Sequence, residues 1–166
     1  IQEEVSQGVG RIAGHLGLSN MIMFYDSNNI QLSTKVDEVS TEDIVAKYEA
    51  WGWNVISIDG NDAAEIRQAL NRAIAETEKP TLIVGHTLMG KGAVGKEGED
   101  FSNKVSTHGQ PLSAAGGDTA KTIANLGGDP EKPFQIFKDV EELYARRREE
   151  LKKWYALRKE EESIWR

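Results

Sequence analysis

Short apolar runs alternate with helix-like segments along the first half of the chain, and this alternation restricts the possible folds more than any other feature. The apolar runs end in turn-forming residues and predict strands at 21–25, 54–58 and 81–84. Helical spacing of apolar residues precedes each run, at 3–16, 43–51 and 63–76. Because strands that alternate with helices form parallel sheets, we predict an α/β fold with helices on both faces of the sheet.

Several residues mark where these helices begin and end. Residues 40–43 supply a cap and acids for the second helix, and Asp62 caps the third. Gly17 is placed to end the first helix. The glycines within that helix predict close packing against the sheet.

The second half of the chain has a different pattern. Residues 101–128 are rich in glycine and lack periodicity, so we predict a long functional loop or a partly ordered segment. Residues 138–166 predict a charged helix with sparse apolar contacts.

Composition excludes several classes of protein. A chain of 166 residues is long enough for one domain with a real core. The net charge of -7 argues against a general nucleic-acid or anionic-membrane surface, and the lack of cysteine excludes disulfides and thiolate chemistry. No apolar run approaches the roughly 20 residues of a membrane span, and the acidic start is unlike a signal peptide, so we predict a cytoplasmic setting. Because Ile1 rather than Met opens the sequence, we expect a fragment of a longer protein.

Polar residues directly after the first strand are the first candidate site. Asp26, Asn28 and the carbonyl of Ile30 could offer oxygen ligands to a hard cation beyond the carboxyl end of a parallel strand. The alternative is a turn stabilised by Asp and Asn without any metal.

Three further features could carry chemistry. The glycine-rich residues 88–92 after the third strand could approach a phosphate, or form a flexible surface loop. His86 and His108 could bind phosphate or move protons, whereas His15 reads as a structural residue. Glu3 and Glu4 could be catalytic carboxylates, although acids in a first helical turn are more often partners of the helix dipole.

Taken together, ordered landmarks resemble the thiamine-diphosphate domain of transketolases. The segments that carry the resemblance lie in order along residues 1–115, at 2–3, 13–18, 22–30, 47–53, 79–83, 90–92 and 107–112. The most specific are Ala-Gly-His-Leu at 13–16, Tyr-Asp-Ser-Asn-Asn-Ile at 25–30 and Thr-His-Gly-Gln-Pro-Leu at 107–112.

The resemblance implies a function and a role for five residues. Asn28 would bind Mg²⁺ or Ca²⁺ through its side-chain oxygen and Ile30 through its carbonyl, while Met89 and His108 would lie near thiamine diphosphate. Glu3 would belong to the carboxylate network of a dimer interface, which supports an activating glutamate on the neighbouring subunit. The implied activity is transfer of a two-carbon ketol unit from a ketose phosphate to an aldose phosphate, in the pentose phosphate pathway.

The sequence also departs from the family pattern. The Gly-Asp-Gly triplet that opens the cofactor motif is missing, and we expect it just before Ile1. We therefore expect residues 1–115 to be part of the thiamine-diphosphate domain, lacking its N-terminal strand, and residues 116–166 to lead as a loop and helix to a missing domain. The isolated chain is predicted to be inactive and to need the remainder of the subunit and a homodimer partner. The alternatives are another thiamine-diphosphate enzyme, such as a 1-deoxyxylulose-5-phosphate synthase or a phosphoketolase, and a non-catalytic α/β interaction module.

Overall fold

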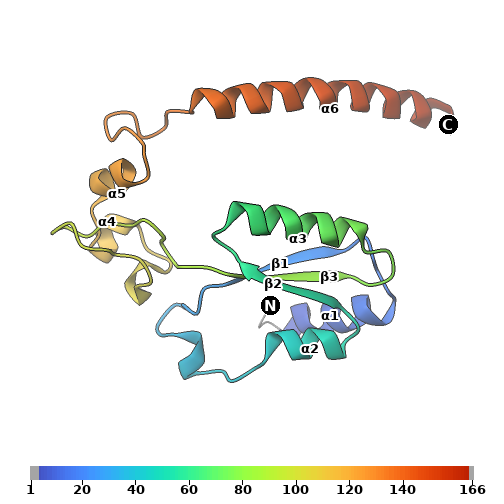
Figure 1. The fold of residues 1–166 in the computed structure, drawn as a ribbon, viewed down its shortest axis with the longest axis horizontal. Helices are drawn as coiled ribbons and strands as arrows, with labels where there is room; N and C mark the ends of the chain where they lie inside the picture. Colours follow the sequence, from blue (N-terminus) through green and yellow to red (C-terminus); the bar gives the residue numbers. More distant parts are fainter. Residues whose placement is uncertain (1–3, 165–166) are drawn as a thin grey trace.

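A three-stranded parallel sheet forms the centre of the molecule (Figure 1). The computed structural model describes residues 4–164, with side chains to residue 161. The strands are β1 (Ile22–Ser27), β2 (Asn54–Asp59) and β3 (Thr81–His86), in the order β1-β3-β2, so β3 lies in the middle. The predicted α/β class and the three predicted strands are confirmed, with each strand one or two residues longer at its carboxyl end.

Helices cover both faces of the sheet, as predicted. Helices α1 (Glu4–His15) and α2 (Ile44–Ala50) lie on one side and α3 (Ala63–Ala75) on the other (Figure 1). The alternation of side chains along β3 separates two cores, because Leu82 and Val84 face one side and Ile83 the other. The first core is made of Ala13, Tyr48, Trp53, Leu82 and Val84, and the second of Ile56, Ala69, Ala73 and Ile83.

The helix ends follow the residues that predict them. The Asp62 carboxylate accepts hydrogen bonds from the backbone N–H groups of Ala64 and Glu65, at 2.7 and 3.1 Å, and so caps α3. Asp43 caps α2 in the same way by accepting from Ala46 N at 3.0 Å. Gly17 has the positive φ of +60° that ends α1.

Gly10 and Gly14 of α1 approach Tyr48 of α2 and Trp51 at its end rather than the sheet, and this corrects the sequence expectation. A Cβ on Gly14 would lie 1.8 Å from the carbonyl oxygen of Trp51, at the end of α2. Beside this contact, the indole N–H of Trp53 donates to the carbonyl of Gly10 at 2.8 Å. The two helices can therefore come close only because Gly14 has no side chain.

The outer strand β1 is covered on one face only. Met23 and Tyr25 pack against the first core, whereas Ile22 and Phe24 point to the face that carries α3 and are 37% and 44% exposed. The apolar surface of the sheet thus continues past the edge of α3.

The segment 101–128, predicted to be a long loop or partly ordered, contains two short α-helices and a 3-10 helix, so it is partly ordered. Helix α4 (Leu112–Ala115) ends at Gly116, and α5 (Thr119–Asn125) begins at Asp118, whose carboxylate accepts from Lys121 N at 2.9 Å. The Thr122 hydroxyl of α5 accepts from Val94 N at 2.9 Å. Long-range bonds of this kind order a segment that has no apolar periodicity of its own.

The predicted charged helix is present as α6 (Lys138–Ile164) and lies apart from the sheet, on the side that carries α3 (Figure 1). Large apolar side chains remain exposed along it, including Leu143, Trp154 and Leu157. Within the described part of the chain, no helix is long and apolar enough to span a membrane.

Candidate functional site

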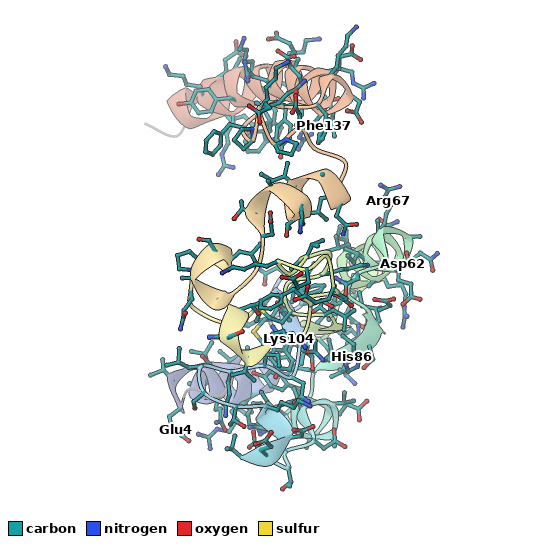
Figure 2. The ribbon with its side chains drawn as sticks, turned by 90° about the vertical axis from the view of Figure 1, so that its left-hand side faces the viewer. Glu4, Asp62, Arg67, His86, Lys104 and Phe137 are labelled. Atoms are coloured by element: carbon teal, nitrogen blue, oxygen red, sulfur yellow. The ribbon has the colours of Figure 1, made fainter. Side chains whose placement is uncertain are left out.

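The carboxyl ends of the three strands meet at one edge of the sheet, which Figure 2 shows facing the viewer. In the strand register, Ser27 of β1 and Asp59 of β2 both lie beside His86 of β3. Ligands of parallel α/β proteins bind at this edge because loops that leave neighbouring strands toward opposite faces of the sheet open a crevice between them. The residues that the family resemblance assigns to the cofactor and metal belong to segments that follow β1 or β3, and they are Asn28, Ile30, Met89 and His108.

The turn after β1 is held by its own hydrogen bonds. The Asn28 side-chain oxygen accepts from the N–H of Ile30 at 2.9 Å, and the Ile30 side chain is buried. Asn29 adopts a positive φ of 58°, and its side chain pairs with Asp37 through two hydrogen bonds of 2.9 and 3.0 Å. The turn is therefore the polar Asx turn that the residues allow.

This turn remains compatible with a cation. An amide oxygen has two lone pairs, so Asn28 can accept from Ile30 and still offer a second direction. Among the described residues, no group of three or more His, Asp or Glu side chains could hold a metal ion. A cation at Asn28 and Ile30 would thus need further oxygen ligands from the substrate, from water or from another part of a larger protein.

Asp26 faces the exit of β3 rather than the turn. Its carboxylate accepts a hydrogen bond from the hydroxyl of Thr87. Sequence reasoning had grouped Asp26 with Asn28 as a candidate ligand, and it had not singled out Thr87. Alternation along a strand would place residues 26 and 28 on one face, but β1 ends at Ser27, so Asn28 is free to turn away from Asp26.

The glycine-rich loop after β3 contacts the segments around Asn103 and Thr107. Met89 is half-buried, and its carbonyl accepts from Asn103 N at 2.7 Å. A Cβ on Gly90 would lie 3.8 Å from Thr107, so this loop passes beside the segment that leads to His108. Met89 and His108 are therefore brought to the same side of the sheet.

His108 follows a short 3-10 helix, η2 (Val105–Thr107). Its Nδ1 atom is buried and has no hydrogen-bond partner among the described residues. Next to it, a Cβ on Gly109 would lie 3.4 Å from Leu32, which belongs to the loop after β1. A buried ring nitrogen without a partner costs free energy unless a ligand or water satisfies it.

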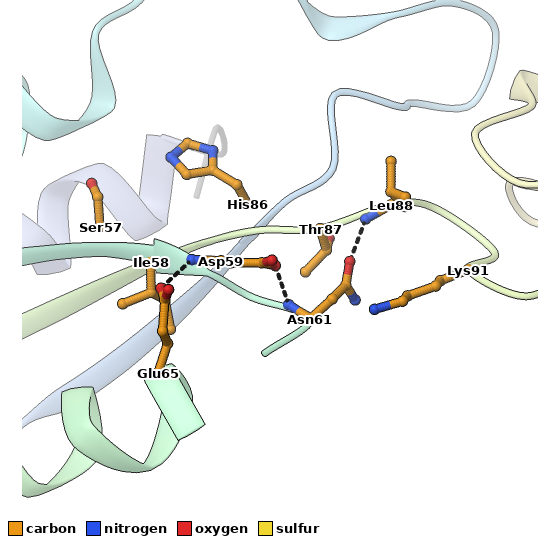
Figure 3. A pocket seen from close by; sticks show the side chains of 9 residues that line it. All are labelled: Ser57, Ile58, Asp59, Asn61, Glu65, His86, Thr87, Leu88 and Lys91. Carbon is orange, nitrogen blue, oxygen red and sulfur yellow. Dashed lines mark hydrogen bonds between the residues drawn. The ribbon is translucent and has the colours of Figure 1, made fainter. Parts of the chain in front are cut away.

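His86 lies between two cavities at the same edge. The larger one, of about 620 Å³, lies over the ends of β2 and β3 and is shown in Figure 3. Its lining residues are Ser57, Ile58, Asp59, Asn61, Glu65, His86, Thr87, Leu88 and Lys91. The smaller, of about 380 Å³, lies between β1, β3 and the start of α2, and it includes Tyr25, Asn29 and Asp37.

The smaller cavity is lined by a tyrosine, Tyr25, whose hydroxyl has a raised pKa. Burial raises the pKa of the Tyr25 hydroxyl, a hydrogen bond with Ser27 opposes the rise, and the charges of Asp26 and Glu42 add to it. Tyr25 is therefore a neutral hydroxyl near pH 7.

His15 lies in α1, outside these segments. Its side chain is exposed at the end of that helix, and its structural role stays a prediction. Glu3 lies outside the described residues.

This arrangement defines an α/β protein whose candidate ligand site lies beyond the carboxyl edge of a parallel sheet. The family model described as "Transketolase, thiamine diphosphate binding domain" matches residues 1–163. The chain belongs to this family.

Individual relatives agree with the family match. Transketolase 2 of Xanthobacter flavus is 41% identical over 149 residues, which cover 89% of this chain and 20% of the relative. The crystal structure of transketolase from Campylobacter jejuni superposes with a TM-score of 0.73 at 33% identity, covering 84% of this chain and 21% of that one. A Pichia stipitis transketolase in complex with sedoheptulose 7-phosphate gives a TM-score of 0.80 at 29% identity, covering 94% and 23%. The chain thus spans about a fifth of the length of the curated relatives that it matches.

Proposed function

We propose that this chain forms part of the thiamine-diphosphate site of a transketolase. The assembled enzyme would transfer a two-carbon ketol unit from a ketose phosphate to an aldose phosphate, in the cytoplasmic pentose phosphate pathway. The observation that carries the proposal is the convergence of the loops bearing Asn28, Met89 and His108 at one edge of the sheet, in a chain of this family.

The residues at this edge suit a metal-bound diphosphate. Asn28 and the carbonyl of Ile30 would hold Mg²⁺ or Ca²⁺ through oxygen, and the metal would neutralise the diphosphate in a protein of net charge -7. The buried Nδ1 of His108 would gain a partner from the cofactor. Met89 would supply apolar contact and help to exclude water.

Thiamine diphosphate, when bound, supplies the carbanion chemistry of ketol transfer. The work of this chain would be to orient the cofactor and keep its surroundings dry. The loops after β1 and β3 would carry out both tasks, because they meet over the sheet edge and are hydrogen-bonded to the strands beneath them.

Residues 1–115 would form the cofactor-binding part of the domain, because every proposed site residue falls within them. Residues 116–166 would contact the remainder of the subunit, since α6 lies apart from the sheet with exposed apolar side chains. The exposed face of β1 at Ile22 and Phe24 would also be covered in the assembly. Glu3 would join the carboxylate network of a homodimer interface.

The test is reconstitution. The purified chain alone should show no ketol transfer and little binding of thiamine diphosphate with Mg²⁺ or Ca²⁺, whereas combining it with the remainder of a transketolase subunit should restore both. Ketol transfer by the purified chain alone would refute the proposed dependence on the remainder. A combined protein that neither binds the cofactor nor transfers ketol units would refute the proposed function.

The metal assignment has a matched control. In the combined protein, Asn28→Ala should weaken metal-dependent binding by roughly tenfold or more, as expected for the loss of a ligand or its support. Asn71→Ala makes the same chemical change on the exposed surface of α3 and should bind like the wild type. Equal affinity for the two variants would remove the assignment.

The other functions considered from the sequence are less well supported. The relatives and structures compared above are transketolases, which favours this activity over a 1-deoxyxylulose-5-phosphate synthase, a phosphoketolase or a non-catalytic module.

A further inference from the structure

The exit of β3 is held from both sides by the turns of the two outer strands. On the β1 side, the Thr87 hydroxyl donates to the Asp26 carboxylate, and the Thr87 N–H donates to the Ser27 carbonyl at 3.3 Å. Thr87 is the first residue beyond the strand, where the regular ladder ends. The hydroxyl and the N–H of Thr87 therefore both donate to β1, the strand that leads into the turn of the proposed metal site.

On the β2 side, the Asn61 side chain provides a hydrogen-bond acceptor where the backbone pairing of β2 and β3 has ended. The Asn61 side-chain oxygen accepts from the N–H of Leu88 at 3.0 Å, and Figure 3 shows this bond across the larger cavity. Asn61 is itself oriented, because its N–H donates to the Asp59 carboxylate at 2.8 Å. In addition, the N–H of Gly60 donates to the carbonyl of His86 at 2.8 Å.

The turn after β2 is shaped to reach this strand end. A Cβ on Gly60 would lie 2.6 Å from the Thr87 methyl group and 2.9 Å from the backbone of Gly85. Only glycine allows the turn to press so closely on β3. The hydrogen bond between Asn61 and Leu88 therefore depends on the close backbone packing of the turn after β2 against the end of β3.

The held segment leads directly into the glycine-rich loop. The Leu88 carbonyl accepts from Lys91 N at 3.2 Å, and the Met89 carbonyl accepts from Asn103 N at 2.7 Å. The position of Leu88 therefore determines where Met89 and the following turn lie. On the other side, Asp26 precedes Asn28 by two residues, so the same set of bonds joins the two halves of the proposed site.

We propose that Thr87 and Asn61 are positioning residues of the cofactor site. With Asp26 they form what we call the β3-exit clamp, which holds the loop carrying Met89 in register with the turn carrying Asn28. Neither Thr87 nor Asn61 needs to contact the cofactor, because each acts through the backbone that it fixes. The cofactor part of this inference rests on the function proposed above.

The clamp itself is tested on the whole chain without any ligand, by amide hydrogen exchange measured residue by residue. Asn61→Leu removes the acceptor and should speed exchange of the Leu88 amide roughly 2- to 10-fold, the loss expected for one hydrogen bond. Asn61→Asp keeps an acceptor oxygen and should restore slow exchange. Unchanged exchange at Ile83, in the buried core, shows that a variant is folded. A Leu88 amide that exchanges equally in the Leu variant and the wild type overturns the clamp.

The second arm uses Thr87→Val, with Thr87→Ser as the variant that retains the hydroxyl. In the chain combined with the remainder of a transketolase subunit, Thr87→Val and Asn61→Leu should raise the Kd of thiamine diphosphate with Mg²⁺ several-fold, and Thr87→Ser and Asn61→Asp should restore it. If the wild-type assembly binds and these variants bind equally well, the positioning role is overturned while the proposed function stands. If the wild-type assembly does not bind, the proposed function falls, and the positioning role falls with it.

Discussion

Gly14→Ala should destabilise the fold even though alanine is the better helix former. Gly14 lies near the end of α1, and a Cβ there would be 1.8 Å from the Trp51 carbonyl oxygen, 2.9 Å from its carbonyl carbon and 3.1 Å from the Trp53 ring. The first distance is about 1.5 Å shorter than the roughly 3.3 Å at which carbon and oxygen atoms meet in proteins. Because the obstacle is backbone, α1 or the end of α2 must move.

The magnitude follows from two opposing effects. Overpacking of this kind costs typically about 1–3 kcal/mol, and a backbone overlap belongs near the upper end of that range. Alanine offsets about 1 kcal/mol through its helix propensity. We therefore expect a net loss of about 2 kcal/mol in the free energy of unfolding, which lowers the Tm of a chain this long by roughly 4–8 °C.

Gly8→Ala is the matched control in the same helix. A Cβ on Gly8 meets nothing within 4 Å, so only the propensity term remains. This variant should gain about 0.5–1 kcal/mol. Thermal unfolding followed by far-UV circular dichroism gives both values. A Gly14→Ala chain as stable as the Gly8→Ala chain would refute the close approach of α1 and α2.

Three other substitutions test single contacts. Trp53→Phe removes the indole donor of the bond to the Gly10 carbonyl, so urea unfolding should show a loss of about 0.5–1.5 kcal/mol, and an unchanged midpoint would contradict the bond. Asp62→Ala removes the cap of α3 and should cost about 1 kcal/mol, whereas Asp62→Asn should retain most of the stability. Hydrogen bonds from the N–H groups of Glu78 and Lys79 lower the pKa of Glu76 below 4.5, so its stabilising effect is present above that pH and is lost as the pH falls through the lowered value. The stability difference between wild type and Glu76→Gln should therefore shrink on acidification, and a difference that does not change with pH would contradict this account.

The fold class was predictable because its signals are local. The apolar runs at the three strands are short, and caps such as Asp62 stand where the helical spacing begins. The segment 101–128 was predicted less well, because α5 has no apolar stripe and is held by contacts with residues near Val94. Hydrogen bonds between residues so far apart in the sequence produce no periodic pattern of apolar residues from which a helix could be predicted.

The candidate site was predictable in part. Asn28, Met89 and His108 could be named from family landmarks, and the turn at Asn28 follows from the preference of Asn for such turns. Their roles stay predictions until metal and cofactor binding are measured. The sequence gives no signal for Asn61 and Thr87, because each is an ordinary polar residue just after the end of a strand.

The sequence by itself determined the alternation of helices and strands, the helix caps and the polar turn after the first strand. These depend on backbone preferences and on periodicity within a few residues. Only the tertiary structure decided that β3 lies between β1 and β2, and that Gly10 and Gly14 face the end of α2. It also decided that Asp26 and Asn61 meet the exit of the same strand. The physical reason is that strand order and loop contacts arise from packing between distant segments, where burial and hydrogen-bond satisfaction select one arrangement from many that the local pattern allows.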